Sequence, residues 1–564
     1  MGSRTVGRRC GRKERSSVLA SFADIPDRGL SCDVAIVGAG AAGLTLARTL
    51  AAEGVDVVLL EAGGDKKTNA SQEFYRGELV DPVRHPHTHN YRVRALGGTS
   101  TIWGGRAIPL DPIDLEERPW VPGSGWPIAY AELGADYSMA LKAAEAGLPA
   151  YAPADALPGE QEELAPGLDG DYVRTTVERF SRPTNFWRRY GAELARSESA
   201  KVFRNAPVTR IQLSADGNSV EWLDVAGPDG ARRRITARNY VLALGGLETT
   251  RLLLASNDVR RDGIGNDSGQ LGRNYMSHLC ETVGTVTFTG PPEGIAYDYA
   301  QDGDGIYLRR RLWLTDRAQR EHGLLNTTFR THLPEPGDPG HGDAVLSAMF
   351  LVKDMVLYEY SRKFVDKPVG WAGRARHVSN IVRQPLRLAR FGTNWLRKRT
   401  FADRKLPSVV LGSAANSYAL EFHAEQAPNP DSRLTLSAER DALGMPRLKV
   451  DWRITDLDIE SLEKSYALLA AELERTGTGR LDFDREKLRE RAHRHGIVGG
   501  HHIGTTRMAA DPRQGVVDTD LRVHGVGNLY VASSSVFPTS GQANPTLTIL
   551  ALTLRLARHL SHPG

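Results

Sequence analysis

The sequence predicts an α/β protein, α+β overall, that is divided into more than one domain. The chain has 564 residues, which is more than a single hydrophobic core usually accommodates. Short apolar runs are followed by glycine-rich turns and then by helical patterns, which is the order of a βα unit in a parallel sheet. Residues 205–244 alternate apolar and polar side chains between turn dipeptides, a pattern typical of strands joined by tight turns.

The composition is that of a globular protein and gives no sign of a charged macromolecular partner. Hydrophobic residues make up 40% of the chain and charged residues 25%, and the formal net charge is +4. So small an excess of charge gives no reason to expect a nucleic-acid partner. The three cysteines, Cys10, Cys32 and Cys280, have no paired spacing, so we expect neither a disulfide framework nor a zinc site. A reducing, cytoplasmic location fits this usage best.

Residues 1–29 are basic and include a twin arginine, and we interpret them as a flexible leader. A secretion signal would need an apolar stretch of roughly 7–15 residues next, and the segment that follows is shorter and more polar. No run along the chain approaches the roughly 18 apolar residues of a membrane span, so we do not expect a membrane partner.

The first βα unit carries a dinucleotide fingerprint. The apolar run Val34–Val37 leads directly into Gly38-x-Gly40-x-x-Gly43, and the next apolar run ends at Glu61. The first glycine permits the tight turn, the second lets the backbone approach a pyrophosphate, and the third lets helix and strand pack closely. The helix N-terminus offers free N–H groups to the phosphates, and Glu61 can hydrogen-bond ribose hydroxyls. The position of this unit near the start of the chain favours FAD over NAD.

Two later segments suit the rest of such a cofactor. Residues 239–256 form a second βα unit that can close the nucleotide-binding sheet. Residues 91–107, “YRVRALGGTSTIWGGRA”, place two glycine pairs around small hydroxyl residues and a tryptophan. Such a loop can press against a flat ring or a phosphate, although a generic glycine-rich turn is the alternative. The candidate contacts in it are Gly98, Ser100, Trp103 and Gly104.

The C-terminal part holds the remaining reactive groups. “GGHHIGTTRM”, residues 499–508, contains two adjacent histidines, and Asn544 precedes Pro545 and Thr546 where a helix begins. An asparagine N-cap followed by proline at the first helical position would explain the second motif without any chemistry.

Several long segments, in order from Asp33 to about Leu560, resemble the glucose–methanol–choline (GMC) family of FAD-dependent alcohol oxidoreductases. They include “VAIVGAGAAGLTLA”, “LGGTSTIWGG”, “VLALGGLETTRLLL”, “GNDSGQLGRNYMSH” and the tail from Gly499. “TSTIWGG” together with the His…Asn tail resembles the branch of pyranose oxidases and bacterial C-glycoside oxidases, which act on ring hydroxyls of sugars or glycosides. The resemblance therefore implies an FAD-dependent enzyme.

The resemblance also distinguishes the two adjacent histidines. The family's catalytic histidine lies three residues before the glycine of its GT step, which places it on His501 and leaves His502 as a pocket or packing residue. The second catalytic residue of the family, His or Asn, falls on Asn544. The pair is implied to face the flavin. His501 would be the general base, Asn544 would hydrogen-bond the same substrate oxygen, and hydride would pass to flavin N5.

Further cofactor contacts are implied in the same way. Val208 would meet the adenine end through its backbone, and Thr546 also falls among the cofactor contacts. Ser533 stands where many members carry Asp, and its hydroxyl can still hydrogen-bond a ribityl or phosphate group. In pyranose oxidases a histidine in the loop before the tryptophan bonds covalently to the flavin. Ile102 takes its place here, so we expect non-covalent FAD.

In the family the Rossmann-like FAD-binding domain is discontinuous, and the substrate domain has an antiparallel sheet covered by helices. Mapped onto this chain, the FAD-binding domain takes residues 30–110, 200–285 and 495–564, and the substrate domain takes 111–199 and 286–494. Residues 350–405 form a basic, aromatic-rich helical insert. Three interpretations of this insert stay open: helices packed on the substrate domain, a lid or oligomer contact, and a membrane-surface helix.

These features predict an enzyme that oxidises a secondary or primary hydroxyl of a sugar, glycoside or sugar-like compound to the carbonyl. The electron acceptor, O₂ or another, and self-association into a homo-oligomer are left open. Two alternatives remain, a lyase of the same fold with structural FAD and a dehydrogenase for non-sugar alcohols. The chemistry needs no metal, and the histidine-rich tract of His85, His87 and His89 is interpreted as a loop near the flavin entrance.

Overall fold

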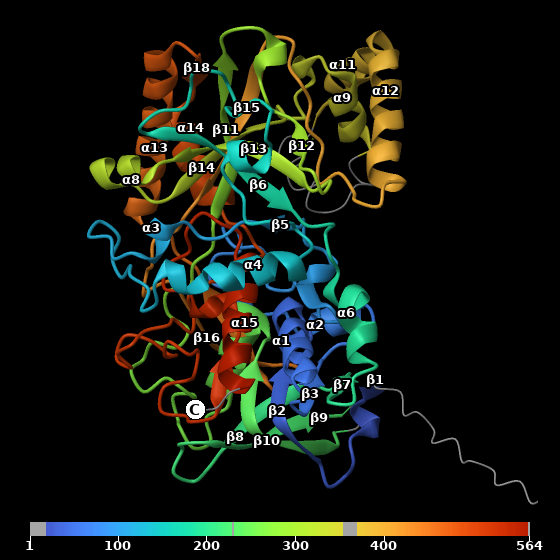
Figure 1. Cartoon of the computed structure of the whole chain (residues 1–564), viewed down its shortest axis with the longest axis vertical. Coiled ribbons are helices and arrows are strands. Elements are labelled where there is room, and N and C mark those ends of the chain that lie inside the picture. Colours follow the sequence, from blue (N-terminus) through green and yellow to red (C-terminus); the bar gives the residue numbers. More distant parts are fainter. Residues whose placement is uncertain (1–18, 228–229, 353–368, 562–564) are drawn as a thin grey trace, which may run out of the picture.

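The computed structural model describes residues 19–227, 230–352 and 369–561. Two eight-stranded sheets lie one above the other along the long axis of the molecule (Figure 1). A smaller sheet pairs β4 (Glu78–Leu79), β16 (Arg433–Arg440) and β17 (Pro446–Asp451). The mixture of parallel and antiparallel sheets with helices confirms the predicted fold class.

The first large sheet, in the lower half of Figure 1, is parallel with an antiparallel edge. The strand order is β1-β7-β3-β2-β10-β9-β8, and β19 pairs with β10. Its strands are β1 (Leu19–Ser21), β2 (Leu30–Val37), β3 (Val57–Leu60), β7 (Ala200–Arg204), β8 (Val208–Leu213), β9 (Val220–Ala226), β10 (Arg232–Leu242) and β19 (Leu529–Val531). Only the pairs β10–β9 and β9–β8 are antiparallel. The sheet is therefore assembled from early, middle and late parts of the chain.

Helices pack on this sheet as the apolar patterns predict. β3 is buried along its whole length. Both α1 (Ala41–Ala52) and the C-terminal α15 (Thr546–Ser561) bury an apolar face, and the two helices contact each other. Other described helices are α2 (Asn69–Glu73), α3 (Pro112–Leu115), α4 (Gly134–Ala143), α5 (Pro153–Ala156), α6 (Phe186–Leu194), α7 (Gly245–Ala255) and α8 (Asp316–His322). α4 packs on α15 and α6 packs on α1.

The structure differs from the sequence-based map at several boundaries. Residues 1–18 of the predicted leader lie outside the described residues, but β1 pairs with β7 and Phe22 and Ile25 are buried. The end of that segment is therefore part of the sheet. α4 and α6 come from the predicted substrate segment 111–199 yet pack on helices of the first sheet.

The second large sheet, in the upper half of Figure 1, is antiparallel at every pairing. Its order is β18-β11-β15-β14-β13-β6-β5, and β12 pairs with β13. The strands are β5 (Arg106–Ala107), β6 (Val173–Phe180), β11 (Leu279–Phe288), β12 (Tyr299–Gln301), β13 (Tyr307–Leu314), β14 (Thr327–His332), β15 (Ser417–Ala424) and β18 (Gly479–Asp482). β5 and most of β11 fall in segments that the sequence-based map gave to the FAD-binding domain. The ends of these strands carry much of the site described below.

Helix α13 (Asp456–Thr476) covers this sheet together with α14 (Arg485–His495). Its N-terminus is a capping box, in which Thr455 Oγ1 accepts the Asp458 N–H and the Asp458 carboxylate accepts the Thr455 N–H. Its buried face centres on Tyr466, whose ring lies 5.2 Å from Phe329 on β14 and 6.0 Å from Phe422 on β15, measured between centroids. These aromatic contacts fix the helix on the sheet.

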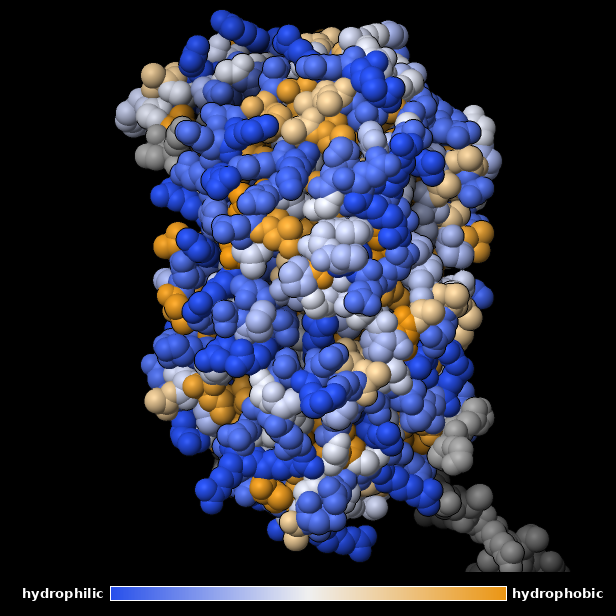
Figure 2. Space-filling view, turned by 90° about the vertical axis from the view of Figure 1, so that its left-hand side faces the viewer, coloured by the Kyte–Doolittle hydropathy of each residue, from blue (hydrophilic) through white to orange (hydrophobic). Residues whose placement is uncertain are grey.

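The predicted basic insert is helical where it is described. It contains α11 (Trp371–Arg383) and α12 (Pro385–Trp395), which lie beside α9 (Ala344–Leu351) (Figure 1), whereas residues 353–368 lie outside the described residues. Among the described helices, none combines the length and the apolar character that crossing a bilayer requires. On the face shown in Figure 2, apolar residues lie in small groups among hydrophilic ones.

Candidate active site and cofactor site

The loop that carries His501 is held against the segment before β11. Met276 and Ile503 exchange two backbone hydrogen bonds, of 2.9 and 3.0 Å, so the two segments run side by side. Gly504 has a φ of +89°, and a Cβ there would come within 2.3 Å of the Asn274 carbonyl oxygen. Glycine is therefore required at this point of the loop. The pairing places His501 opposite His278.

His501 and Asn544 lie next to each other, although 43 positions separate them in the chain. The Asn544 Nδ2 atom is 3.2 Å from His501 Nε2. The other side of the amide, Oδ1, accepts a hydrogen bond of 3.3 Å from Arg106 Nη1, which fixes the amide orientation. Asn544 precedes α15, as its sequence position suggested, and its side chain is turned to this contact.

His278 completes a hydrogen-bonded chain behind His501. Its Nδ1 atom lies 2.7 Å from His501 Nδ1, and its Nε2 atom lies 3.3 Å from the carbonyl oxygen of Ser540. A carbonyl oxygen only accepts, so Nε2 of His278 carries a proton. Burial lowers the pKa of His278 to about 4, so the ring is neutral and its Nδ1 is unprotonated. The proton between the two rings therefore belongs to His501 Nδ1.

It follows that the second nitrogen of His501 is free of a proton. Burial, and then His278 and Arg106, lower the pKa of His501 well below its usual value, so this ring is neutral too. With its proton on Nδ1, the Nε2 atom presents a lone pair, toward which Asn544 donates. This is the protonation state that a general base needs.

A third imidazole, His423 of β15, stacks on His278 with 4.8 Å between ring centroids. Its Nδ1 atom is 2.7 Å from the Gln542 carbonyl oxygen, and burial lowers its pKa well below the usual value. Nitrogen atoms of the three histidines all lie within 4.8 Å of one another, a spacing that could hold a metal ion. Each ring, however, already has a nitrogen engaged in a hydrogen bond to protein, so the cluster is stable as a set of neutral imidazoles.

The three glycines of the fingerprint lie in the tight turn between β2 and α1 and in the first turn of α1. Gly38 has a φ of +104°, and a Cβ at Gly43 would come within 1.9 Å of the Gly38 carbonyl oxygen. Gly40, which precedes α1, has no side-chain cap, and a Cβ there would meet no atom within 4 Å. The first turn of α1 therefore has no side-chain cap and has open space beside Gly40, which fits a pyrophosphate.

Glu61 directly follows β3, and Val208 is the first residue of β8, both strands of the first large sheet. The Glu61 carboxylate accepts the backbone N–H groups of Ala39 (2.9 Å) and Gly63 (2.7 Å), and burial raises its pKa. Val208, at the start of β8, lines a small cavity of about 40 Å³ together with Leu60 and other residues of the first sheet. The Glu61 carboxylate therefore holds the glycine turn at Ala39 and the backbone at Gly63 in place through these two hydrogen bonds.

The loop between the two glycine pairs, Gly97-Gly98 and Gly104-Gly105, reaches the main cavity. Gly98 opens the short 3₁₀ segment Gly98–Thr101, and a Cβ on it would come within 2.9 Å of the Gly40 Cα. Ile102, Trp103 and Gly104 line the cavity, and a Cβ on Gly104 would meet no atom within 4 Å. The loop therefore contacts the start of α1 at Gly98 and borders open space at Gly104, which fits a cofactor that spans both.

Of the three predicted hydroxyl contacts, Ser100 and Ser533 are bonded within the protein, whereas Thr546 lines the main cavity. Ser100 Oγ donates to the Gly97 carbonyl oxygen (2.6 Å) and accepts the Phe186 N–H (3.2 Å), so it stabilises the loop from within. Ser533 Oγ accepts the Ser535 N–H (3.1 Å) and also lies against the hydroxyl of that residue. Thr546, by contrast, lines the main cavity beside Asn544.

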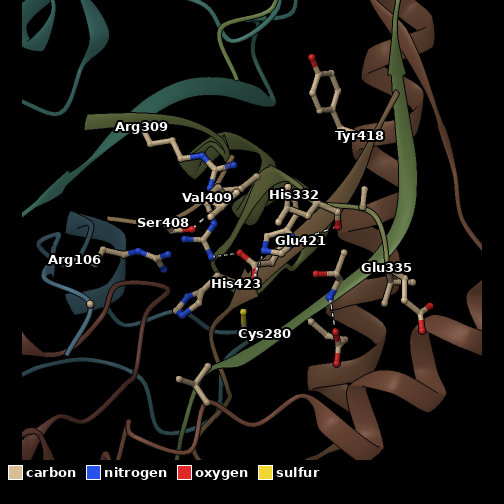
Figure 3. A pocket seen from close by; sticks show the side chains of 18 of the residues that line it. Arg106, Cys280, Arg309, His332, Glu335, Ser408, Val409, Tyr418, Glu421 and His423 are labelled. Carbon is tan, nitrogen blue, oxygen red and sulfur yellow. Dashed lines mark hydrogen bonds and ion pairs between the residues drawn. The ribbon is translucent and has the colours of Figure 1, made fainter. Parts of the chain in front are cut away.

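The main cavity has a volume of about 1250 Å³ and joins these groups to the second sheet. Its wall combines the loop 99–106, the turn with His501, and the ends of strands β11, β13, β14 and β15. Figure 3 shows its charged end, where Arg106, Arg309 and Glu421 point toward the space beside His423. His501 and Asn544 open into the same space.

Sequence reasoning missed several of these residues. His278 is the last residue of the family motif “GNDSGQLGRNYMSH”. A histidine inside a family motif could have indicated a functional residue. Arg106 directly follows the glycine-rich loop, but nothing local indicated that it would reach Asn544. His423 lies within an ordinary strand pattern and had no sequence signal. The tract from His85 to His89 forms turns, in which His85 Nε2 lies 3.0 Å from the Tyr275 hydroxyl.

The chain is similar to flavoenzymes along most of its length. Residues 33–349 match the family model described as FAD dependent oxidoreductase, and residues 428–553 match the model described as GMC oxidoreductase. The chain is 25% identical to the fructose dehydrogenase large subunit of Gluconobacter japonicus, over 94% of this chain and 97% of the relative. It is 33% identical to a C-glycoside 3-oxidase of Microbacterium trichothecenolyticum, over 64% of this chain and 53% of the relative. Pyridoxine 4-oxidase from Mesorbium loti shares the fold, with a TM-score of 0.52 and 18% identity over 94% of this chain and 99% of that one.

Proposed function

Because the chain belongs to the FAD-dependent oxidoreductases of the glucose–methanol–choline (GMC) family, we propose that it oxidises a hydroxyl group of a sugar, glycoside or sugar-like compound to the carbonyl. The relatives support this substrate class, since they include a fructose dehydrogenase and a C-glycoside 3-oxidase. A cavity of about 1250 Å³ with many polar and charged side chains also suits a hydroxyl-rich molecule.

The observation that carries the proposal is the protonation state of His501. Its Nε2 lone pair faces Asn544 and opens to the cavity, and the hydrogen bond from Nδ1 to His278 keeps it unprotonated. In the proposed reaction this nitrogen takes the proton of the substrate hydroxyl. Positioned proton transfer of this kind contributes on the order of 10²–10⁴-fold to the rate.

The neighbouring groups hold the substrate oxygen in place. Asn544 Nδ2 donates a hydrogen bond to that oxygen as negative charge develops on it. Arg106 keeps the amide in this orientation through its bond to Oδ1. FAD, when bound, supplies the acceptor for the hydride that leaves the carbinol carbon. The first turn of α1 and the loop 98–104 would hold the cofactor, and Ile102, which cannot bond covalently to a flavin, supports non-covalent binding.

The direct test is anaerobic mixing of the yellow holoenzyme with a panel of sugars, glycosides and simple alcohols. We expect bleaching of the flavin by at least one sugar or glycoside. Bleaching by simple alcohols alone would show a dehydrogenase or oxidase for non-sugar alcohols, and no bleaching by any compound would contradict the proposed oxidation. Admission of air to the bleached enzyme then shows whether O₂ accepts the electrons.

The assignment of the base is tested with His501→Ala and a matched control. We expect this variant to bind FAD but to reduce it about 10²–10⁴-fold more slowly with the substrate found in the panel. His524→Ala is the control, because His524 lies in the same tail, outside the cavity lining, and bonds to the Ala509 carbonyl oxygen. A normal rate of flavin reduction in His501→Ala would exclude His501 as the base.

A further inference from the structure

Three arginines converge at the end of the cavity beside His423. Arg106 lies on β5, Arg309 on β13 and Arg330 on β14, and all three line the cavity. Figure 3 shows the guanidinium groups of Arg106 and Arg309 directed toward the same space above His423 and Glu421. The side chains of Arg309 and Arg330 are almost completely buried, at 5% and 3% exposure.

Two of these cations have carboxylate partners. Arg330 bonds to Glu421 at 2.6 Å and to Glu178 at 3.1 Å, and Arg106 Nε lies 3.0 Å from Glu178. Glu178 is thus shared between two arginines, and Glu421 pairs with Arg330 in the same network. The charges of Arg106 and Arg330 are therefore balanced within this network.

Arg309 stands opposite Glu178 in the β6–β13 ladder and lies over the Tyr299 ring, but its hydrogen bonds go to neutral groups. Its Nη2 atom donates to the carbonyl oxygen of Thr331 and lies 3.5 Å from the hydroxyl of that residue. Its Nε–H, and the Nε–H of Arg330, are buried and have no hydrogen-bond partner within the part of the chain that the structure describes. Buried N–H groups without partners are rare in proteins and costly.

Among the three arginines and the two glutamates of this network, positive charges outnumber negative ones by one. Arg106, Arg309 and Arg330 contribute three positive charges, and Glu178 and Glu421 contribute two negative ones. The neighbouring His423, His278 and His501 are neutral. A buried cation without a counter-charge is unfavourable unless a ligand supplies that charge.

We propose that this end of the cavity is a subsite for a substrate carboxylate, bound chiefly by Arg309. The proposal rests on the proposed function and narrows its substrate class to sugars or glycosides that carry a carboxylate, of the uronic-acid type. The guanidinium of Arg309 lines the cavity and can donate a charge-assisted hydrogen bond to a carboxylate oxygen. The positive charge of Arg309 is balanced in this arrangement.

Arg309 and the proposed base line the same cavity. Arg309 lies on β13, and His423 lies on β15 with its ring 6.0 Å from that of His501, measured between centroids. A ligand long enough to cross the cavity between these strands can therefore contact both Arg309 and His501.

The proposal is tested by binding, which does not depend on turnover. The oxidised holoenzyme is titrated anaerobically with methyl glucuronide, methyl glucoside and glucose 6-phosphate, and binding is followed by the change in flavin absorbance. We expect methyl glucuronide to bind at least ten-fold more tightly than methyl glucoside. In Arg309→Gln this ratio should fall to about one, and in Arg309→Lys, which keeps the charge, part of it should remain.

Arg310→Gln is the matched control. Arg310 is the next residue on β13, but it lies on the opposite face of the strand and bonds to the Gln161 and Glu162 carbonyl oxygens. The control should keep the full ratio, and thermal unfolding of every variant shows that it is folded.

The remaining outcomes each decide the question. Equal binding of the two glycosides, no binding of either, or a preference that survives in Arg309→Gln would overturn the subsite. Tighter binding of glucose 6-phosphate than of methyl glucuronide, lost in Arg309→Gln, would overturn the carboxylate in favour of phosphate. An Arg309-dependent preference for methyl glucuronide without flavin reduction by any sugar would support the subsite and count against the proposed oxidation alone.

Discussion

Single side chains set the chemistry of this site through hydrogen bonds that run from Ser540 through His278 to His501. The carbonyl oxygen of Ser540 can only accept, so it fixes the proton of His278 on Nε2. His278 then accepts from His501 Nδ1, which leaves Nε2 of His501 unprotonated. His278 touches neither the substrate oxygen nor Asn544 in this arrangement, so we regard it as a positioning residue.

We expect His278→Gln to lower the rate of flavin reduction about 10–100-fold, the usual range for groups that orient a functional histidine. The variant loses the imidazole acceptor for His501 Nδ1, so His501 populates both tautomers and the base is present only part of the time. Stopped-flow reduction under anaerobic conditions measures the rate. A purely structural role would change FAD content or thermal stability without changing the pH profile of kcat/KM, and that result would contradict this prediction.

The proposed role of His501 as the base, together with its burial, predicts the pH range of activity. Burial, aided by His278 and Arg106, lowers its pKa well below 6.5. A general base acts in its neutral form, so activity is lost only when the pH falls through this lowered pKa. We expect kcat/KM to stay level from about pH 8 down to about pH 6 and to fall only at lower pH. Initial rates across this range provide the check, and a decline that begins between about pH 8 and pH 7 would show a base of ordinary or raised pKa.

Helix α1 and the turn before it form the element to which the cofactor phosphates would bind. The three glycines of this turn have different structural reasons. Gly38 needs its positive φ, and Gly43 needs the absence of a Cβ against the Gly38 carbonyl oxygen. Gly40 has neither restriction, because its φ of −80° is ordinary and the space beside it is open.

Gly40→Ala should therefore separate cofactor binding from folding. We expect the apoprotein to keep its thermal stability, while FAD content falls at least ten-fold because the methyl group occupies the space expected for the pyrophosphate. Gly134→Ala, at the start of α4, is the control, since its Cβ also meets no atom within 4 Å but lies on a helix other than α1. Absorbance of the purified variants and thermal unfolding without FAD measure both effects. Normal FAD content in Gly40→Ala would place the pyrophosphate elsewhere.

The whole molecule forms the site from segments that are distant in the chain. The first sheet takes strands from residues 19–60, 200–242 and 529–531, and the cavity adds strand ends from the second sheet. A cofactor that lies along α1 and the loop 98–104 would contact several of these segments at once. Its binding free energy would then contribute directly to the stability of the folded state.

We accordingly expect added FAD to raise the melting temperature of the apoprotein in a concentration-dependent way. At a free concentration of 100 times Kd the gain is about 2.7 kcal/mol of unfolding free energy. A melting temperature that does not respond to FAD would contradict the bridging role.

Ile102 offers no atom for a covalent bond to the flavin. Acid precipitation of the holoenzyme should therefore leave the yellow flavin in the supernatant. Flavin retained in the pellet would show a covalent link.

The sequence alone determined those features whose causes lie within one segment. The turn at Gly38, Gly40 and Gly43 could be predicted because its backbone angles and close contacts involve a single βα unit. The strands and helices with long apolar patterns, such as β2 and α15, were predicted for the same reason. The importance of His501 and Asn544 came from the family resemblance, and the structure adds that their side chains lie 3.2 Å apart.

Only the tertiary structure decided the features that depend on distant partners. The end of the predicted leader joins the sheet because β1 pairs with β7, about 180 residues further along the chain. The tautomer of His501 depends on His278 and on a carbonyl group 262 positions after it. The charge of Arg309 is unpaired because of what surrounds it on three strands, and a sequence pattern does not contain that environment. Neighbouring residues in the sequence determine local geometry, whereas protonation and charge balance depend on every group that folding brings into contact.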